Sequence, residues 1–378
     1  MNLLIELLST QLNQTTLSPE LRVRLTPEVL SKLYRVSRCH DLAHVVGSAL
    51  AHADVELPDP LPSQFKKENT LAVYRCAQQK QTLQEVAHFF EIEQIPYIPL
   101  KGAILRNFYP QESMRVGCDV DILVHEEDIA RSCAVLEAQG YQVAERNYHD
   151  VTLISPTKVH LELHFTLREN MKNLDPVLER VWEFAVRDGG YRYGLLKEFF
   201  VFQAFAHMAY HFLSGGCGLK SLTDIWVMER KMGYSYKDAD LLLKEAGIFQ
   251  FAKEMTNLSL VCFDGGASDS FMEQLLAYII SGGSYGTVQN KIAVQKSQSG
   301  GTAGYVIRRL FPSLRTMKQI YPVLERAPVL LPFCWVARWF SKLFAGQGRK
   351  AIREVQVSQR VLTAQTDEIQ KIRTRLEI

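Results

Sequence analysis

Residues 99–124 read PLKGAILRNFYPQESMRVGCDVDILV and combine a predicted turn with a predicted strand. The last six residues, 119–124, place two aspartates among β-branched and apolar residues, a pattern that predicts a strand. Side chains two positions apart in a strand point to the same face, so Asp119 and Asp121 should project together. Neighbouring carboxylates repel each other, and a divalent cation with oxygen ligands relieves that repulsion. The pair therefore indicates a metal site of the kind used in phosphoryl transfer, with a solvated strand entry as the alternative.

The residues before this strand predict a phosphate site. An apolar run at 97–100 ends at Lys101 and Gly102, and a helix-like segment follows at 103–108. A glycine at a strand-to-helix turn lets backbone N–H groups approach an anion, and Lys101 adds positive charge there. Glycine also ends many strands for steric reasons alone, so this interpretation depends on the neighbouring motifs.

A second strand is predicted downstream, where residues 159–165 read VHLELHF. The alternation puts His160, Glu162 and His164 on one face and the apolar residues on the other. If this strand lies beside residues 119–124 with its polar side on the same face, Glu162 becomes a third carboxylate over one point. The alternative is an edge strand with one solvent-exposed face.

These motifs together resemble the nucleotidyltransferase superfamily with the DNA polymerase β-like fold. They are most similar to its branch of bacterial uncharacterised nucleotidyltransferases, in which a Lys-Gly turn replaces the more usual Gly-Ser. The resemblance is sharp over residues 95–168 and looser through Asp224. It implies that a nucleotidyl group is moved from a nucleoside triphosphate, such as ATP, to an unknown hydroxyl or phosphate acceptor. The implied cofactor is Mg²⁺, with Mn²⁺ as the alternative.

The resemblance also assigns roles to residues of this chain. It implies that Asp119, Asp121 and Glu162 bind metal and carry catalysis. It further implies that residues of two separate segments contact the nucleotide or its phosphates. They are Lys101, Gly102 and Arg115 in the first segment and His211, Lys220 and Asp224 in the second. One departure is Cys118, which precedes the first aspartate where the superfamily often has a polar side chain and so weakens any polar help from that position.

Composition bounds the class of protein. The 378 residues are 47% apolar, as in ordinary globular proteins, and the net charge of +2 is too small to indicate a nucleic-acid partner by itself. The seven scattered cysteines never form a C-x-x-C motif, which predicts free thiols in the cytoplasm. We expect neither a signal peptide nor a membrane-spanning helix.

The predicted fold class is α+β, with a small mixed sheet in the order β-α-β-α-β-β flanked by N-terminal and C-terminal helical regions. The five predicted segments are an N-terminal helical region at 1–68, a nucleotidyltransferase core at 69–168, a helical domain completing the cleft at 169–283, a flexible loop at 284–302 and a basic, aromatic-rich helical segment at 303–378.

The C-terminal segment leaves several interpretations open. Basic and aromatic residues interleave at 305–353, which fits peripheral contact with the inner membrane face, contact with a nucleic acid, or a plain helix packed on the core. Three functions rival the transferase. They are a nucleotide-binding regulator without catalysis, a toxin-like modifier of transfer RNA or protein, and a membrane-surface factor in envelope polysaccharide synthesis.

Overall fold

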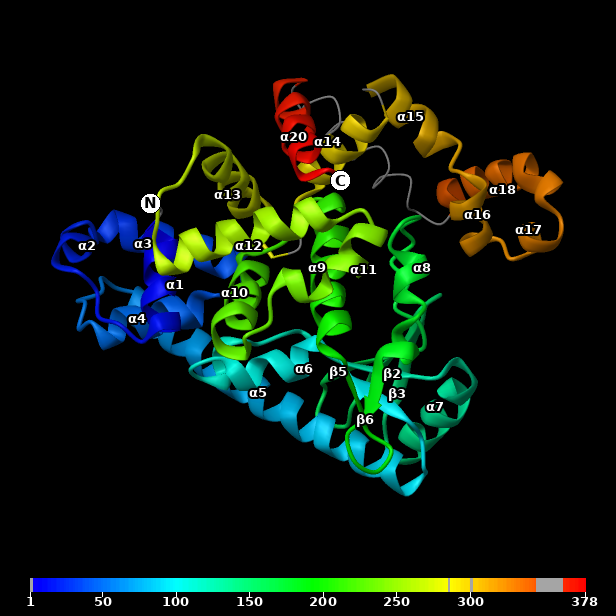
Figure 1. Cartoon of the computed structure of the whole chain (residues 1–378), viewed down its shortest axis with the longest axis horizontal. Helices are drawn as coiled ribbons and strands as arrows, with labels where there is room; N and C mark the ends of the chain where they lie inside the picture. Colours follow the sequence, from blue (N-terminus) through cyan, green and yellow to red (C-terminus); the bar gives the residue numbers. More distant parts are fainter. Residues whose placement is uncertain (1–2, 285, 300–301, 345–362) are drawn as a thin grey trace. The chain divides into compact units, whose positions relative to one another are not determined.

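The computed structural model describes residues 3–284, 286–299, 302–344 and 363–378 (Figure 1). The chain divides into two compact units. The first comprises Met1–Tyr210, Cys217–Ser284 and Leu376–Ile378, and the second comprises His211–Gly216 and Tyr285–Arg375.

A five-stranded mixed sheet forms the centre of the first unit. Its order is β1-β2-β5-β4-β3, in which β2 is parallel to β5 and the other neighbouring pairs are antiparallel. The strands are β1 (Tyr97–Pro99), β2 (Asp119–Val124), β3 (Gln142–Arg146), β4 (Asp150–Ile154) and β5 (His160–His164). This arrangement confirms the predicted α+β class with a small mixed sheet.

Strand β3 corrects the predicted order, because the sequence analysis assigned no strand between the second helix and β4. β3 lies at the edge of the sheet, and four of its five residues are exposed. Its pairing with β4 shifts register between Val143 and Glu145. An exposed, irregular edge strand carries no alternation of buried and polar residues, so nothing in its sequence distinguishes it from a loop.

One face of the sheet is covered by helices α5 (Leu61–Ile92) and α7 (Ile129–Ala138) (Figure 1). Val120, Ile122 and Val124 of β2 are at most 4% exposed and form one core with Val86 and other residues of these helices. Because strand side chains alternate, the aspartates of β2 project from the opposite face. The helical layer therefore buries the apolar side and leaves the carboxylate side uncovered by α5 and α7.

Helix α5 crosses the predicted boundary between residues 68 and 69. It is one continuous helix that begins at Leu61, with Pro62 in its first turn, where a proline fits without loss of a hydrogen bond. The N-terminal region and the core therefore share this helix.

The remaining helices of the first unit surround the sheet and α5. Helix α1 packs against α4 and α12, which brings the beginning of the chain against residues more than 200 positions later. The bounds of these helices are α1 (Leu3–Asn13), α2 (Pro19–Val23), α3 (Pro27–Cys39), α4 (Ala43–His52), α6 (Lys101–Leu105), α8 (Asp175–Leu178), α9 (Lys197–Leu213, whose last turn belongs to the second unit), α10 (Leu219–Val227), α11 (Asp240–Glu245), α12 (Phe249–Asp264) and α13 (Ser270–Gly282). Strands β6 (Ala185–Arg187) and β7 (Tyr193–Leu195) form a separate hairpin.

The second unit is helical and corrects the prediction of a loop at 284–302. Helix α14 (Val288–Gln298) occupies most of that segment, and the Thr287 side chain caps it by accepting a hydrogen bond from the Asn290 N–H at 3.0 Å. Its buried residues Ile292, Ala293 and Val294 are consecutive, so they lack the helical spacing on which the prediction depended.

Further helices complete the second unit. They are α15 (Thr302–Leu310), α16 (Leu314–Ile320), α17 (Val323–Arg326), α18 (Leu331–Phe344) and α20 (Thr363–Leu376). The part of the basic segment at 345–353 lies outside the described residues. Within the described ranges, no helix combines the length and apolar character that crossing a bilayer requires.

Candidate functional site

The carboxylates predicted on two separate strands lie side by side. Strands β2 and β5 are parallel neighbours, and their register pairs Asp121 with Glu162. Paired residues in adjacent strands project from the same face, and Asp119, two positions before Asp121, shares that face. The predicted adjacency of the two strands is therefore confirmed.

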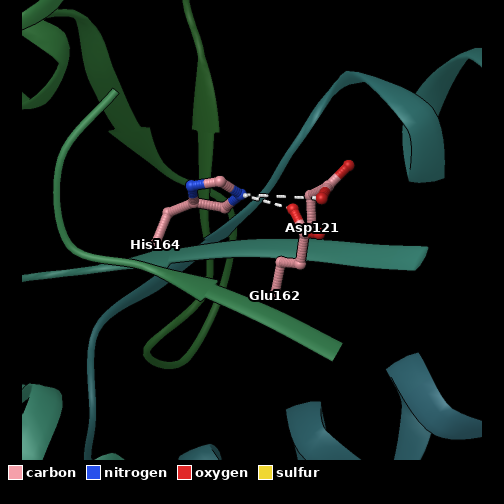
Figure 2. Close-up of side chains that lie close together, drawn as sticks. All are labelled: Asp121, Glu162 and His164. Atoms are coloured by element: carbon pink, nitrogen blue, oxygen red, sulfur yellow. Dashed lines mark ion pairs between the residues drawn. The ribbon is translucent and has the colours of Figure 1, made fainter. Parts of the chain in front are cut away.

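A histidine completes the cluster. His164 follows Glu162 by two positions on β5, and its Nε2 atom lies 3.6 Å from Asp121 Oδ1 and 3.6 Å from Glu162 Oε2 (Figure 2). Among the described residues, Asp121, Glu162 and His164 form a group whose possible ligand atoms all lie within 4.8 Å of one another. His164 was not among the predicted site residues, although the alternation at 159–165 already placed it on the polar face.

The charges of this cluster depend on one another. Burial by itself would lower the pKa of His164, but its interactions with the Asp121 and Glu162 carboxylates raise it to about 10. Burial opposes ionisation of Asp121 as well, yet the hydrogen bond and charge of His164 hold the pKa of that carboxyl below its usual value. At neutral pH an imidazolium therefore lies between two carboxylates.

Asp119 ionises far less readily than an ordinary carboxyl group. Burial, followed by the charges of Asp121 and Glu162, raises the pKa of Asp119 to about 7. Desolvation is the larger cause, and the like charges of Asp121 and Glu162 add to it. A cation bound beside Asp119 would favour its ionised form and so offset both effects.

The Lys101-Gly102 turn is attached directly to the carboxylate strand. The Leu100 N–H donates to the Asp121 carbonyl at 3.0 Å, and α6 begins at the next residue. Gly102 has a steric reason to lack a side chain, because a Cβ atom there would lie 3.1 Å from Arg115 Nη1. A side chain at position 102 would therefore crowd the Arg115 guanidinium, which approaches the turn closely.

Lys101 supplies positive charge beside the carboxylates. Burial lowers the pKa of its ammonium to about 8, although Asp224 and Asp121 attract the charge. Within the described residues, its Nζ atom makes no hydrogen bond or ion pair. A buried cation without a bound carboxylate is suited to receive an anion.

Arg115 is fixed by a buried ion pair with Asp224 of α10. Its Nε and Nη2 atoms donate to the two carboxylate oxygens at 3.0 and 2.9 Å, and the Tyr109 hydroxyl donates to the same carboxylate at 2.6 Å. Asp224 thus joins α10 to the loop before β2. Arg115 Nη1 is not used in this pair and faces the Gly102 turn.

The other two predicted nucleotide contacts lie in different surroundings. Lys220, also on α10, donates from Nζ to the Val116 carbonyl at 3.2 Å and so contacts the same loop as Asp224. His211 belongs to the second unit. The nucleotide-binding roles of both residues remain predictions.

A hollow adjoins the carboxylates on the side of the turn. It is small and opens to solvent, and Gly102, Arg106, Arg115, Asp119 and Asp121 are among the residues that line it. Cations and carboxylates meet at this hollow. Such an arrangement can hold a metal ion and the phosphates of a nucleotide together.

Arg106 is a further residue that the sequence analysis did not select. Its side chain is buried, its Nη2 atom donates to Gln79 Oε1 at 2.8 Å, and its Nε atom has no hydrogen-bond partner among the described residues. A buried guanidinium nitrogen without a partner is costly, and an anion in the hollow would satisfy it. Only the folded structure shows that Arg106 is buried beside Gln79, because Gln79 lies on α5, 27 positions away.

Comparison with known proteins gives one match. A family model described as uncharacterised nucleotidyltransferase matches residues 27–262, which is more than half of the chain. The matched segment contains the whole five-stranded sheet, the Lys101-Gly102 turn and α10. No curated protein and no solved structure matches the chain.

Proposed function

Because the chain belongs to the family of uncharacterised nucleotidyltransferases, we propose that it is a cytoplasmic enzyme that transfers a nucleoside monophosphate from a nucleoside triphosphate to a hydroxyl or phosphate acceptor. Family membership indicates a transferase of nucleotidyl groups. The dependence on Mg²⁺, with Mn²⁺ as the alternative ion, is part of the proposal.

The parallel register of Asp121 and Glu162, with Asp119 on the same face, is the observation that carries the proposal. The donor set fits a divalent cation, because carboxylate oxygens are the ligands of Mg²⁺ and Mn²⁺. An imidazole nitrogen suits Mn²⁺ better than Mg²⁺, but His164 would first have to lose the proton that it carries at neutral pH. Asp119, Asp121 and Glu162 would hold the ion. When bound, such an ion would neutralise negative charge on the triphosphate oxygens, including those of the phosphoryl group under attack.

Arg106 and Arg115, which line the hollow, and Lys101, which precedes the lining residue Gly102, would bind the triphosphate. Lys101 offers an ammonium without a carboxylate partner, Arg115 offers Nη1 above the Gly102 turn, and Arg106 offers its unsatisfied Nε atom. We assign all three to the β and γ phosphates. Arg115 would act from a fixed position, since Asp224 holds its other nitrogens.

The reaction breaks one phosphorus–oxygen bond and forms another. The acceptor oxygen attacks the α-phosphorus in line with the bridging oxygen to the β-phosphorus, and pyrophosphate leaves with the electrons of the broken bond. If the acceptor is a hydroxyl group, the Glu162 carboxylate would take its proton as the new bond forms. A phosphate acceptor already carries negative charge and would need no proton transfer.

Transfer of label from each of the four nucleoside triphosphates, labelled at the α-phosphate, tests the proposal. The full chain is incubated with a cell extract as a source of acceptors, with Mg²⁺ or with EDTA. We expect label to appear on an acceptor with the native chain and Mg²⁺, and to disappear in the Asp121→Asn and Glu162→Gln variants. The matched control is Glu145→Gln, which changes an exposed glutamate of the same sheet and should leave transfer unchanged.

The outcome also separates the rival functions. Label on transfer RNA or protein identifies a macromolecular acceptor and supports the toxin-like alternative within the same chemistry. Nucleotide binding without any labelled product would instead support a non-catalytic regulator. Undiminished transfer by Asp121→Asn would exclude the carboxylate mechanism.

A further inference from the structure

Helix α18 and the turn before it carry an exposed apolar strip, which consists of Val329, Phe333, Val336 and Phe340. These side chains are 80%, 73%, 43% and 55% exposed, respectively. The spacing of Phe333, Val336 and Phe340 puts these three on one side of α18, and Val329 lies in the 3-10 turn directly before it. Large apolar side chains that share one face in this way mark an interaction surface.

The strip is held outward by the packing of the opposite side of α18. There Cys334 is buried against Met317 and Leu324, and Trp335 packs against the same group. The Trp335 Nε1 atom donates to the Pro312 carbonyl at 2.9 Å. The orientation of α18 within this helical segment is therefore fixed by contacts that do not involve the strip.

The surrounding segment is strongly basic. Residues 305–344 contain seven arginines and lysines and a single acidic residue, Glu325, although the whole chain has a net charge of only +2. This excess of positive charge is local, and it lies outside the residues 27–262 that match the family. Further exposed apolar residues on α15, α16 and α17 accompany it, namely Ile307, Leu310, Ile320 and Val323.

We propose that the helices α15–α18 bind the surface of an anionic lipid bilayer, with the apolar strip inserted among the acyl chains and the basic residues near the lipid phosphates. Burial of exposed apolar side chains and attraction to anionic headgroups are the two forces that hold an interfacial helix. Helix α18 has 14 residues, so it is too short to span a bilayer and suits a position along its surface.

Two other partners fit the surface less well. A nucleic acid would stack its bases on exposed aromatic rings, which Phe333 and Phe340 offer, but the other half of the strip is aliphatic, and Trp335 and Trp339 pack edge-on against Phe311. A second copy of the chain, docked through the same surface, would bring two strongly positive segments together. Charge and side-chain chemistry both favour the bilayer.

Sedimentation of the full chain with lipid vesicles tests this proposal. Vesicles of phosphatidylcholine are compared with vesicles that also contain phosphatidylglycerol. We expect binding to the anionic vesicles only, and binding should weaken as salt is raised because screening reduces the attraction. Replacing two residues of the strip, in the double variant Phe333→Ser with Val336→Ser, should weaken binding at least about tenfold.

A matched double variant controls for a general loss of apolar surface. Val23→Ser with Leu241→Ser removes two side chains that are 83% and 81% exposed in the first unit, and it should bind vesicles like the native chain. Circular dichroism checks that both double variants are folded. Equal weakening by the two double variants, or equal binding to neutral and anionic vesicles, would overturn the proposal.

Two further measurements use the same protein samples. Tighter binding to a single-stranded oligonucleotide than to anionic vesicles at the same salt would assign the surface to a nucleic acid instead. Light scattering that shows a dimer in the native chain and a monomer in the strip variant would assign it to a second copy. The proposal predicts neither result.

Discussion

Replacement of Asp224 by asparagine perturbs the ion pair that joins α10 to the loop before the carboxylate strand. The side chains of Arg115 and Asp224 are only 9% and 13% exposed, and two hydrogen bonds of 3.0 and 2.9 Å connect them. The amide keeps the shape of the carboxylate but removes its charge. Arg115 would then be a buried cation without a counter-charge.

The expected loss of stability is large. Removing one partner of a buried ion pair costs about 3–5 kcal/mol, because the remaining charge stays desolvated. For a unit of this size, such a loss lowers the midpoint of thermal unfolding by on the order of 5–10 °C. The matched control is Asp240→Asn, which breaks a pair with Lys244 whose side chains are 38% and 57% exposed. Exposed pairs contribute at most about 1 kcal/mol.

Thermal unfolding of the full chain at pH 7, followed by circular dichroism, measures both variants. The double variant Arg115→Gln with Asp224→Asn should be more stable than Asp224→Asn alone, because it also removes the uncompensated charge. If Asp224→Asn unfolds at the same temperature as the Asp240→Asn control, Asp224 does not anchor α10 as described.

Three further predictions concern the site. Asp119 has a pKa of about 7 in the folded chain and near 4 when unfolded, so stability should fall as pH rises through this window. Mg²⁺ affinity should rise as the pH passes through about 7, because Asp119 ionises there. Calorimetry at pH 6, 7 and 8 should show a smaller rise for Asp119→Asn. At pH values below about 10, the pKa of His164, the variant His164→Gln should have a lower midpoint of thermal unfolding than the native chain. Mg²⁺ should raise this midpoint more in the variant than in the native chain. If Mg²⁺ no longer raises it in the variant, His164 is a required ligand. Arg106→Gln should weaken binding of inorganic tripolyphosphate at least about tenfold, and Arg131→Gln, whose side chain is 51% exposed, should not.

The sequence was sufficient for the features that depend on strand periodicity. Strand β2 occupies the predicted residues 119–124, and the alternation at 159–165 gave both β5 and the face of Glu162. The polar face of β5 also contained His164, but a histidine in a strand carries no local sign that two carboxylates surround it. The position of His164 between the two carboxylates follows from the parallel register of β2 and β5, which only the folded sheet defines.

The features that the sequence analysis missed depend on distant partners. Arg106 acquires its surroundings from Gln79 of α5. Arg115 and Asp224 were both selected from the sequence, but their ion pair joins positions 109 apart and was not foreseen. Helix α14 lacks the apolar spacing of a surface helix because three consecutive residues are buried. Local pattern therefore predicted four of the five strands, the carboxylates and the Lys101 turn, while Arg106 and the pairing of Arg115 with Asp224 required tertiary structure.

Direct measurement of metal binding tests the central claim, which is that the carboxylates of β2 and β5 form one cation site. Electron paramagnetic resonance gives the amount of free Mn²⁺ during a titration of the full chain at pH 7. We predict that Glu162→Gln weakens Mn²⁺ binding at least about tenfold relative to the native chain, while the control Glu145→Gln binds like the native chain. Equal affinity in the native chain and the Glu162→Gln variant would contradict the account.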